Sequence, residues 1–216
     1  MGSKVAEGRK QRSQEILTEQ GVPFIEHLPT VEDEESARIR TVESVARRAM
    51  ALCVVSCKGE GLEHARALEI VQEYDLESEL SPKEHAFIFN PDPEERDRIQ
   101  FSWMYECYWV MLWALGYVDR LGTPDQVCDV ETAVRIMVNR DSDQFVEDSK
   151  LRAAGQILDA LDLTYRYDWA CVDSRHGSTT IPDWLNCSVV VERHRALNWL
   201  VGYPDNADWD DVTMDT

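Results

Sequence analysis

The sequence is short of basic residues. It holds 22 lysines and arginines against 41 aspartates and glutamates, a formal net charge of −19 over 216 residues. Nucleic-acid binding depends on positive charge that meets the phosphates, so this shortage argues against a nucleic-acid partner. It equally disfavours adhesion to an anionic membrane, and it favours basic partners or cations.

Standard motifs of catalysis and cofactor binding are also missing. The chain has no glycine-rich nucleotide-binding loop, no Gly-x-Ser-x-Gly turn around a nucleophilic serine and no His-Glu-x-x-His zinc motif. Its six cysteines include no Cys-x-x-Cys pair, and no matching ligand pair follows Cys53 and Cys57. We therefore expect no metal and no cofactor, and we interpret most cysteines as small buried apolar residues.

The acidic C-terminal tail does not make a calcium loop. Asn206, Asp208 and Asp210 alternate as calcium ligands do, but Asp211 stands where glycine is needed and no glutamate follows at the twelfth position. A looser cation site among the tail aspartates is a minor alternative. We rather expect these carboxylates to cap a helix, to pair with Arg193 or Arg195, or to be solvated.

The chain shows neither a secretory signal nor a convincing membrane span. Residues 1–10 lack an apolar core of the kind that a signal peptide has. The run 101–118 is long enough to raise the question of a transmembrane helix, because Glu106 is its only charge. That carboxylate and the many aromatic residues favour a helix buried on all sides in a soluble core. We expect a cytoplasmic protein that does not enter the membrane.

Apolar residues recur at helical spacing along most of the chain, and no stretch reads confidently as a strand. We predict an all-α protein with a single compact multi-helix domain. The predicted elements are a buried central helix over about 94–118 and long helices near 34–57, 146–172 and 188–202. Residues 1–30 are expected to form an N-terminal helical arm and linker, and residues 31–216 one helical domain that includes the acidic tail.

The helix predicted at 188–202 carries a charged cluster within an apolar sequence, Glu192 to Arg195. Helical geometry turns Arg193 and His194 toward the face that packs. Because burying a cation without a partner is costly, we expect an acidic partner, and Glu106 is the natural candidate for either of them. The cluster is then either a structural ion pair with a satisfied core histidine or a pocket in which His194 acts as acid, base or ligand.

A set of motifs follows one order along the chain: Leu80-Ser-Pro-x-Glu84, Trp103-x-x-Glu106, Leu112-Trp-Ala-Leu-Gly116, Ile157-Leu-Asp-x-x-Asp-Leu-x-Tyr-Arg166, Val190-Val-Glu-Arg-His-x-Ala-Leu-Asn-Trp-Leu200 and Trp209-Asp-Asp-Val212. In this order they resemble the bacterial domain-of-unknown-function family 4272, from about Arg9 to the C-terminus. Met104 departs from the family's pattern, where a basic residue is expected, and so does Arg195, where an aromatic is expected. The resemblance implies one folded unit and carries no activity. It directs attention to Glu106, Asp162, Arg166, Glu192, Arg193, His194 and the tail aspartates.

Two functions from different classes are open. The first is a binding or regulatory protein whose acidic surface meets a protein partner, for example one that neutralises a basic protein. Its candidate contact residues are Asp162, Arg166, Asp173, Arg175, His176, Trp209, Asp210 and Asp211. The alternative is a hydrolase-like enzyme for a small molecule, with a pocket around His194, Glu192 and Glu106 and with Arg193 as a further catalytic candidate. We rank the binding protein first.

Overall fold

The computed structural model describes residues 3–215, and every regular element in that part of the chain is helical. The predicted all-α class is therefore confirmed. The α-helices are α1 (Lys4–Gln20), α2 (Val42–Gly59), α3 (His64–Glu73), α4 (Pro82–Phe89), α5 (Glu95–Ser102), α6 (Met104–Ala114), α7 (Val130–Val138), α8 (Ser142–Asp148), α9 (Ala154–Arg175) and α10 (Cys187–Leu200). Two short 3₁₀ helices, η1 (Glu77–Glu79) and η2 (Trp209–Asp211), complete the set.

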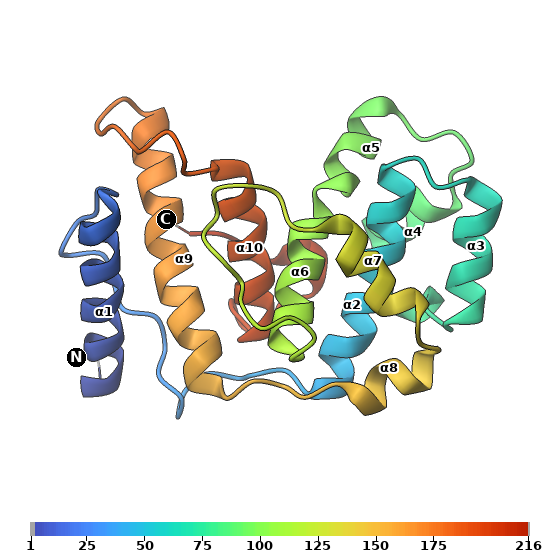
Figure 1. Cartoon of the computed structure of the whole chain (residues 1–216), viewed down its shortest axis with the longest axis horizontal. Helices are drawn as coiled ribbons and strands as arrows, with labels where there is room; N and C mark the ends of the chain where they lie inside the picture. The colour runs from blue at the N-terminus through green and yellow to red at the C-terminus, as the bar shows by residue number, and fades with distance from the viewer. Residues whose placement is uncertain (1–2, 216) are drawn as a thin grey trace.

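Five of these helices lie side by side in the order α1, α9, α10, α6 and α2 (Figure 1). The shorter helices α3, α4, α5, α7 and α8 all contact α2 at the other end of the molecule. As a result α6 has neighbours on every side, and ten of its eleven residues are buried. This explains why the sequence of α6 is apolar on all faces of the helix rather than amphipathic. No helix among residues 3–215 is both long and apolar enough to cross a membrane.

The central helix predicted at 94–118 is two helices. They meet at Trp103, and α5 has no buried residue whereas α6 is almost fully enclosed. Beside this junction, the end of α5 lies close to Gly59 at the end of α2. A Cβ added to Gly59 would lie 2.5 Å from the backbone nitrogen of Ser102. Apolar content predicted the burial of α6 correctly, but it does not show where one helix ends and the next begins.

The other long helices differ from the prediction at their ends. The helix expected at 34–57 begins at Val42, where the Thr41 side chain accepts a hydrogen bond from the Ser44 amide as a cap. The helix expected at 146–172 is α8 followed by α9, with an extended link between them. In that link the amides of Lys150 and Arg152 donate to carbonyls at the end of α6, so the break satisfies backbone groups that would otherwise be unpaired. The last helix, expected at 188–202, begins at Cys187 after the cap residue Asn186 and ends at Leu200.

One pair of cysteines differs from the expectation of free buried thiols. Cys171, near the end of α9, is bonded to Cys187 at the start of α10. The other four cysteines are free. The disulfide lies in a second apolar cluster, formed by Leu17 of α1 with residues of α9 and α10. Sixteen residues separate the two cysteines, and no spacing pattern in the sequence predicts the bond.

The segment 22–41, here called the strap, connects α1 to α2. It has no regular secondary structure and passes along the molecule past one end of α9 (Figure 1). Val22 and Leu28 anchor it through buried side chains. At its far end Arg40 donates from its backbone amide to the carbonyl of Leu200, which fixes the strap against the end of α10.

Candidate functional site

A cavity of about 330 Å³ lies between α9, α10, the strap and the C-terminal tail. This volume is at the lower end of the range for small-molecule sites. Leu161 of α9 and Val201 after α10 supply part of its apolar wall, and Pro29 and Val31 of the strap supply another part. Most of the exposed lining is therefore apolar, as binding pockets for small molecules usually are.

His194 of α10 lines this cavity although it is only 2% exposed. Its Nδ1 lies 2.8 Å from Oδ2 of Asp168 on α9. A carboxylate accepts hydrogen bonds and does not donate them, so Nδ1 carries the proton. The hydrogen bonds formed among residues 3–215 do not engage Nε2, which leaves that atom for a ligand. In the neutral tautomer with the proton on Nδ1, the lone pair lies at Nε2.

Asp168 is 2% exposed, and His194 is the one basic side chain that pairs with it among the described residues. Its second oxygen, Oδ1, is buried without a hydrogen-bond partner among the described residues. Buried polar atoms in folded proteins are nearly always paired, so an unpaired carboxylate oxygen marks an unusual site. The arrangement resembles the orienting carboxylate of a catalytic histidine, because it holds the ring and stabilises an imidazolium.

Besides His194, Thr30 and Asn198, two phenols and two carboxylates contribute polar groups to the lining. Tyr165 of α9 packs against the His194 ring at 5.7 Å between ring centroids. Tyr203 donates from its hydroxyl to Asp215 at 3.0 Å. That hydrogen bond, followed by burial, raises the pKa of Tyr203, because the carboxylate stabilises the protonated phenol. Burial raises the pKa of Tyr165. Glu32 of the strap completes this set.

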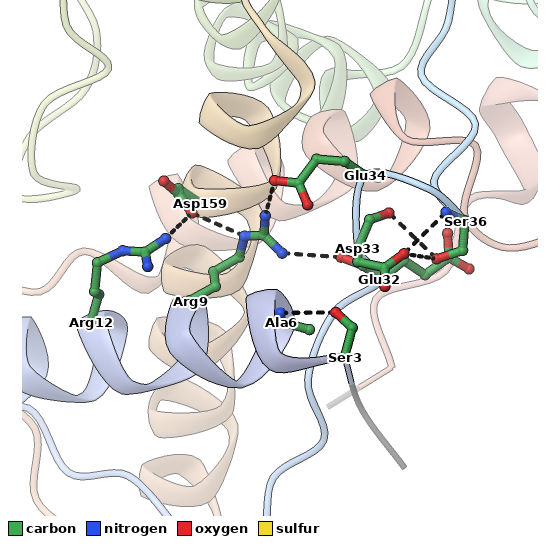
Figure 2. A network of polar contacts seen from close by, with 9 residues as sticks. All are labelled: Ser3, Ala6, Arg9, Arg12, Glu32, Asp33, Glu34, Ser36 and Asp159. Carbon is green, nitrogen blue, oxygen red and sulfur yellow. Dashed lines mark hydrogen bonds and ion pairs between the residues drawn. The ribbon is translucent and has the colours of Figure 1, made fainter.

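The strap is held at the cavity from two helices. Arg166 of α9 donates to the carbonyl of Pro29 at 3.2 Å. Arg9 of α1 donates to the carbonyl of Glu32, also at 3.2 Å. Figure 2 shows that the same Arg9 guanidinium reaches Glu34 at 2.7 Å and Asp159 at 2.9 Å. Arg9 is 1% exposed, so one buried cation ties α1, the strap and α9 together.

Glu106 and Arg193 form a separate network on another side of α10. Arg193 donates from Nε to Glu106 at 3.1 Å and from a terminal nitrogen to the carbonyl of Gly122 at 2.9 Å. The other oxygen of Glu106 accepts from the amide of Cys128. The expected burial of Glu106 beside a cation of α10 is confirmed, and the partner is Arg193 rather than His194. Neither Glu106 nor Arg193 lines the His194 cavity.

Glu192 also lies apart from the cavity. It pairs with Arg195 at 3.3 Å, as its spacing predicts, and accepts from the thiol of Cys107. Burial raises the pKa of Glu192. The predicted pocket around His194, Glu192 and Glu106 is therefore wrong as a combination. Successive residues of a helix point about 100° apart, so neighbours in sequence serve different surfaces of α10.

The residues predicted to contact a partner are scattered. Asp162 and Arg166 form a pair 2.8 Å apart with no exposed side-chain surface, so neither is available to a partner. Trp209 is 7% exposed and packs edge-on against Trp199, which removes it as a surface anchor. An ion pair and a tryptophan both suit an interface, but here the core of the protein encloses all three residues.

The other predicted contact residues lie at two places on the surface. Asp173 and Arg175 belong to the last turn of α9, and His176 caps that helix, away from the cavity. Asp210 accepts hydrogen bonds from the Ser81 hydroxyl and the Lys83 amide at the start of α4. This is the helix-capping role considered for the tail carboxylates, and the pairing of tail carboxylates with Arg193 or Arg195 is not observed. Asp211 is exposed.

Sequence reasoning missed Asp168, Tyr165 and the two walls from the strap and the tail. A signal for two of them was present. Tyr165 and Asp168 are four and seven residues after Leu161, which places all three on one face of the predicted helix. An aspartate on a packing face requires a partner, and the histidine of the neighbouring helix is a natural one. Nothing in the sequence brings Glu32 or Asp215 to the same place.

No group of three histidine, cysteine or acidic side chains within residues 3–215 is arranged to hold a metal ion. A family model described as "Domain of unknown function (DUF4272)" matches residues 9–212. No protein of curated function and no solved structure matches the chain. The chemistry of the cavity therefore has to be argued from its own residues.

Proposed function

The chain belongs to the DUF4272 family, and because the description of that family names no activity, we propose a function from the cavity itself. The protein binds a small molecule beside His194 and acts on it as a hydrolase-like enzyme. One observation carries this proposal. His194 is held through Nδ1 by the buried Asp168, and its Nε2 is left without a partner at a mostly apolar cavity.

His194 is the proposed general base. Nε2 takes a proton from a water molecule or from a ligand group within hydrogen-bond reach, and Asp168 stabilises the imidazolium that forms. Asp168 is a positioning residue, since its 2.8 Å contact with Nδ1 fixes which nitrogen faces the cavity. The apolar walls keep the ligand and exclude bulk water, which strengthens polar interactions at Nε2.

The first test is occupancy of the cavity. Histidine NMR spectra of the wild type are recorded while a library of small molecules is added, with His194 assigned from a His194→Gln variant. Cavity ligands are expected to shift the His194 signals and to leave the exposed His27 unchanged. Val31→Trp, which fills the cavity from a half-buried strap position, is expected to abolish the shifts. Shifts that persist in Val31→Trp argue against binding in this cavity.

The second test is turnover. Wild type, His194→Gln and Asp168→Asn are compared on a panel of small esters, amides and phosphoesters, with His27→Gln as the matched control. Removing a general base is expected to lower the rate by about 10²–10⁴-fold, with the fold checked by circular dichroism. Hydrolysis that His194→Gln leaves intact would exclude the enzyme.

A basic protein partner is the second candidate, and the observation that favours it is the net charge of −19. Such an association is expected to weaken steeply between about 0.05 and 0.5 M salt, because charge attraction is screened. Asp211→Lys, at an exposed tail position, is expected to weaken it further. Association that neither salt nor this substitution changes would exclude recognition by charge.

We propose a cytoplasmic location, and the state of one cysteine pair tests it. Disulfides persist mainly in oxidising compartments, whereas cytosolic thiols are kept reduced. Cells are lysed into acid, free thiols are labelled and the peptides that contain Cys171 and Cys187 are analysed by mass spectrometry. A labelled, reduced pair agrees with the cytosol. A fully bonded pair, as in the structure, points to an oxidising compartment.

A further inference from the structure

Apart from the uncharged side chains of Thr30 and Asn198, the polar groups that line the His194 cavity have a common character. Glu32 and Asp215 are carboxylates, and the lining includes no lysine or arginine. Asp168 engages Nδ1 of His194, which leaves Nε2 as the ring nitrogen available to a ligand. The Tyr203 hydroxyl already donates its hydrogen bond to Asp215. What the cavity offers a ligand is therefore mainly negative charge and hydrogen-bond acceptors.

The two carboxylates act on the same part of the cavity although they come from opposite ends of the chain. After the Asp215 hydrogen bond and burial, the charge of Glu32 further raises the pKa of Tyr203. Burial raises the pKa of Tyr165, the charge of Arg166 opposes that rise, and the charges of Asp162 and then Asp215 add to it. The negative field of the two carboxylates therefore acts mainly at Tyr203, and the aromatic faces of both tyrosines also attract cations.

Two buried arginines near the cavity are already paired with carboxylates. The Arg166 guanidinium lies 6.0 Å from the centre of the Tyr165 ring, outside the lining of the cavity. Asp162 pairs with it on the same helix, and both side chains are fully buried. Arg9, on the far side of the strap, is matched by Glu34 and Asp159. No uncommitted positive charge among these groups offsets Glu32 and Asp215.

We propose that the cavity binds a small organic cation, a primary ammonium group carried on a compact apolar body. The inference rests on the proposed function, because it names the class of molecule that the His194 cavity takes. The ammonium donates to Nε2 of His194 and to the carboxylates, while the apolar body lies against Leu161 and Val201. The cavity of about 330 Å³ lies at the lower end of the range for small-molecule sites, which favours a compact ligand.

Three matched probes test the charge of the ligand: 2-phenylethylammonium, the neutral 2-phenylethanol and the anionic 3-phenylpropanoate. Affinities are measured by calorimetry at pH 7 and by the shifts of His194. The ammonium is expected to bind about tenfold more tightly than the alcohol, and the anion least. The carboxylates are exposed, so this preference is expected to shrink as salt rises.

Variants test whether Glu32 and Asp215 cause the preference for the ammonium over the alcohol. The double variant Glu32→Gln with Asp215→Asn is expected to bind the ammonium and the alcohol equally, without weakening the alcohol. Asp211→Asn removes one exposed tail carboxylate that does not line the cavity, and it is expected to keep the full preference. A preference that survives in the double variant would overturn the assignment to these carboxylates.

The outcomes separate this inference from the proposed function. Equal binding of all three probes, abolished by Val31→Trp, overturns the organic cation and supports a small-molecule site. Tighter binding of the anion also overturns the cation. If none of the probes binds and none shifts His194, the cation proposal fails, and the wider library then decides whether the cavity takes any ligand. Ammonium binding that Val31→Trp leaves unchanged places the cation elsewhere and overturns the inference.

Discussion

At the scale of single residues, the fully buried Asp162–Arg166 pair makes the clearest prediction. The two side chains lie four residues apart on α9 and have no exposed surface. Asp162→Asn leaves a buried guanidinium without its countercharge, and we expect a loss of about 3–5 kcal/mol in the free energy of unfolding. Urea denaturation followed by circular dichroism measures it.

An exposed pair with the same spacing is the control for Asp162→Asn. Arg135 and Glu131 lie four residues apart on α7, with most of both side chains in water. Glu131→Gln is expected to lose only a small fraction of the stability that Asp162→Asn loses, because solvent screens the pair. Equal losses for the two variants would contradict the argument from burial.

Cys57 makes a prediction about pH. Hydrogen bonding by Cys53 and then by the Tyr105 hydroxyl, against the opposing effect of burial, lowers the pKa of Cys57 from 9.0 to about 7. The thiolate is the reactive form, so alkylation of Cys57 by iodoacetamide is expected to rise with pH around a midpoint near 7. Tyr105→Phe removes a donor and is expected to move the midpoint upward. Mass spectrometry of labelled peptides gives the rate at each pH.

Two other free cysteines are internal controls for the same experiment. Burial raises the pKa of Cys107 and also that of Cys128, so neither is expected to react while the protein is folded. A Cys57 midpoint near its ordinary value of 9.0 would show that these donors do not stabilise its thiolate.

At this scale the sequence predicts side-chain contacts in two ways, from local helical spacing and from the cost of a buried charge. It predicted that Glu106 meets a cation of α10. The choice between Arg193 and His194 depends on a rotation of about 100° around the helix, which tertiary contacts decide. Asp168 was missed because its partner lies on another helix, although its helical face was readable.

At the scale of helices, Gly59 makes an unusual prediction. Alanine favours a helix by about 1 kcal/mol over glycine, so a glycine in α2 is normally a weak point. Here a Cβ would lie 2.5 Å from the Ser102 nitrogen and 2.9 Å from the Arg98 carbonyl oxygen, and backbone atoms cannot move aside cheaply. We expect Gly59→Ala to lower stability by about 1–3 kcal/mol through overpacking.

Gly8 of α1 is the matched control for Gly59. Its Cβ would meet only the flexible end of Arg12, at 3.8 Å. Gly8→Ala is therefore expected to raise stability by roughly 0.5–1 kcal/mol, the ordinary helix preference. Thermal and urea unfolding of both variants should show opposite signs, and a stabilised Gly59→Ala would mean that α2 and α5 do not approach as closely as described.

The sequence was enough to predict that the long helices exist, but not the residues at which they begin and end. Apolar periodicity is a property of the helix itself, so it was enough to predict the long helices and the burial of α6. The break at Trp103 and the start of α2 at Val42 depend on contacts with distant segments and on the cap at Thr41. Such contacts leave no periodic trace in the sequence, and alternative caps such as Ser188 are chemically as good as Asn186.

At the scale of the whole molecule, the cavity exists only because four separated parts of the chain meet. The helices α9 and α10 supply Asp168 and His194, the strap supplies Glu32 and the tail supplies Asp215. No local motif encodes this meeting, which is why the predicted site combined residues that lie next to one another in sequence. The strap is the part with no regular structure of its own, so its attachment to α1 and α9 controls the wall of the cavity.

Arg9 therefore makes the prediction at this scale. Arg9→Met keeps an apolar stem of similar length but removes the hydrogen bonds to Glu34, to Asp159 and to the Glu32 carbonyl. Glu34 and Asp159 are 38% and 48% exposed and regain water, so the expected effect is local opening rather than global unfolding. Hydrogen exchange in a peptide covering residues 29–36 is expected to speed up about tenfold, with weaker binding at the cavity.

Arg12 provides a control that separates the loss of contacts to the strap from the loss of a positive charge. It also pairs with Asp159, at 2.7 Å, yet it is 57% exposed and does not touch the strap. Arg12→Met removes the same charge from the same helix, and it is expected to leave both the exchange of residues 29–36 and the affinity for 2-phenylethylammonium unchanged. If Arg9→Met behaves like Arg12→Met, the apolar anchors Val22 and Leu28 and the remaining hydrogen bonds hold the strap without Arg9. If only Arg9→Met opens the strap and weakens the ligand, the buried cation of α1 holds one wall of the site in place.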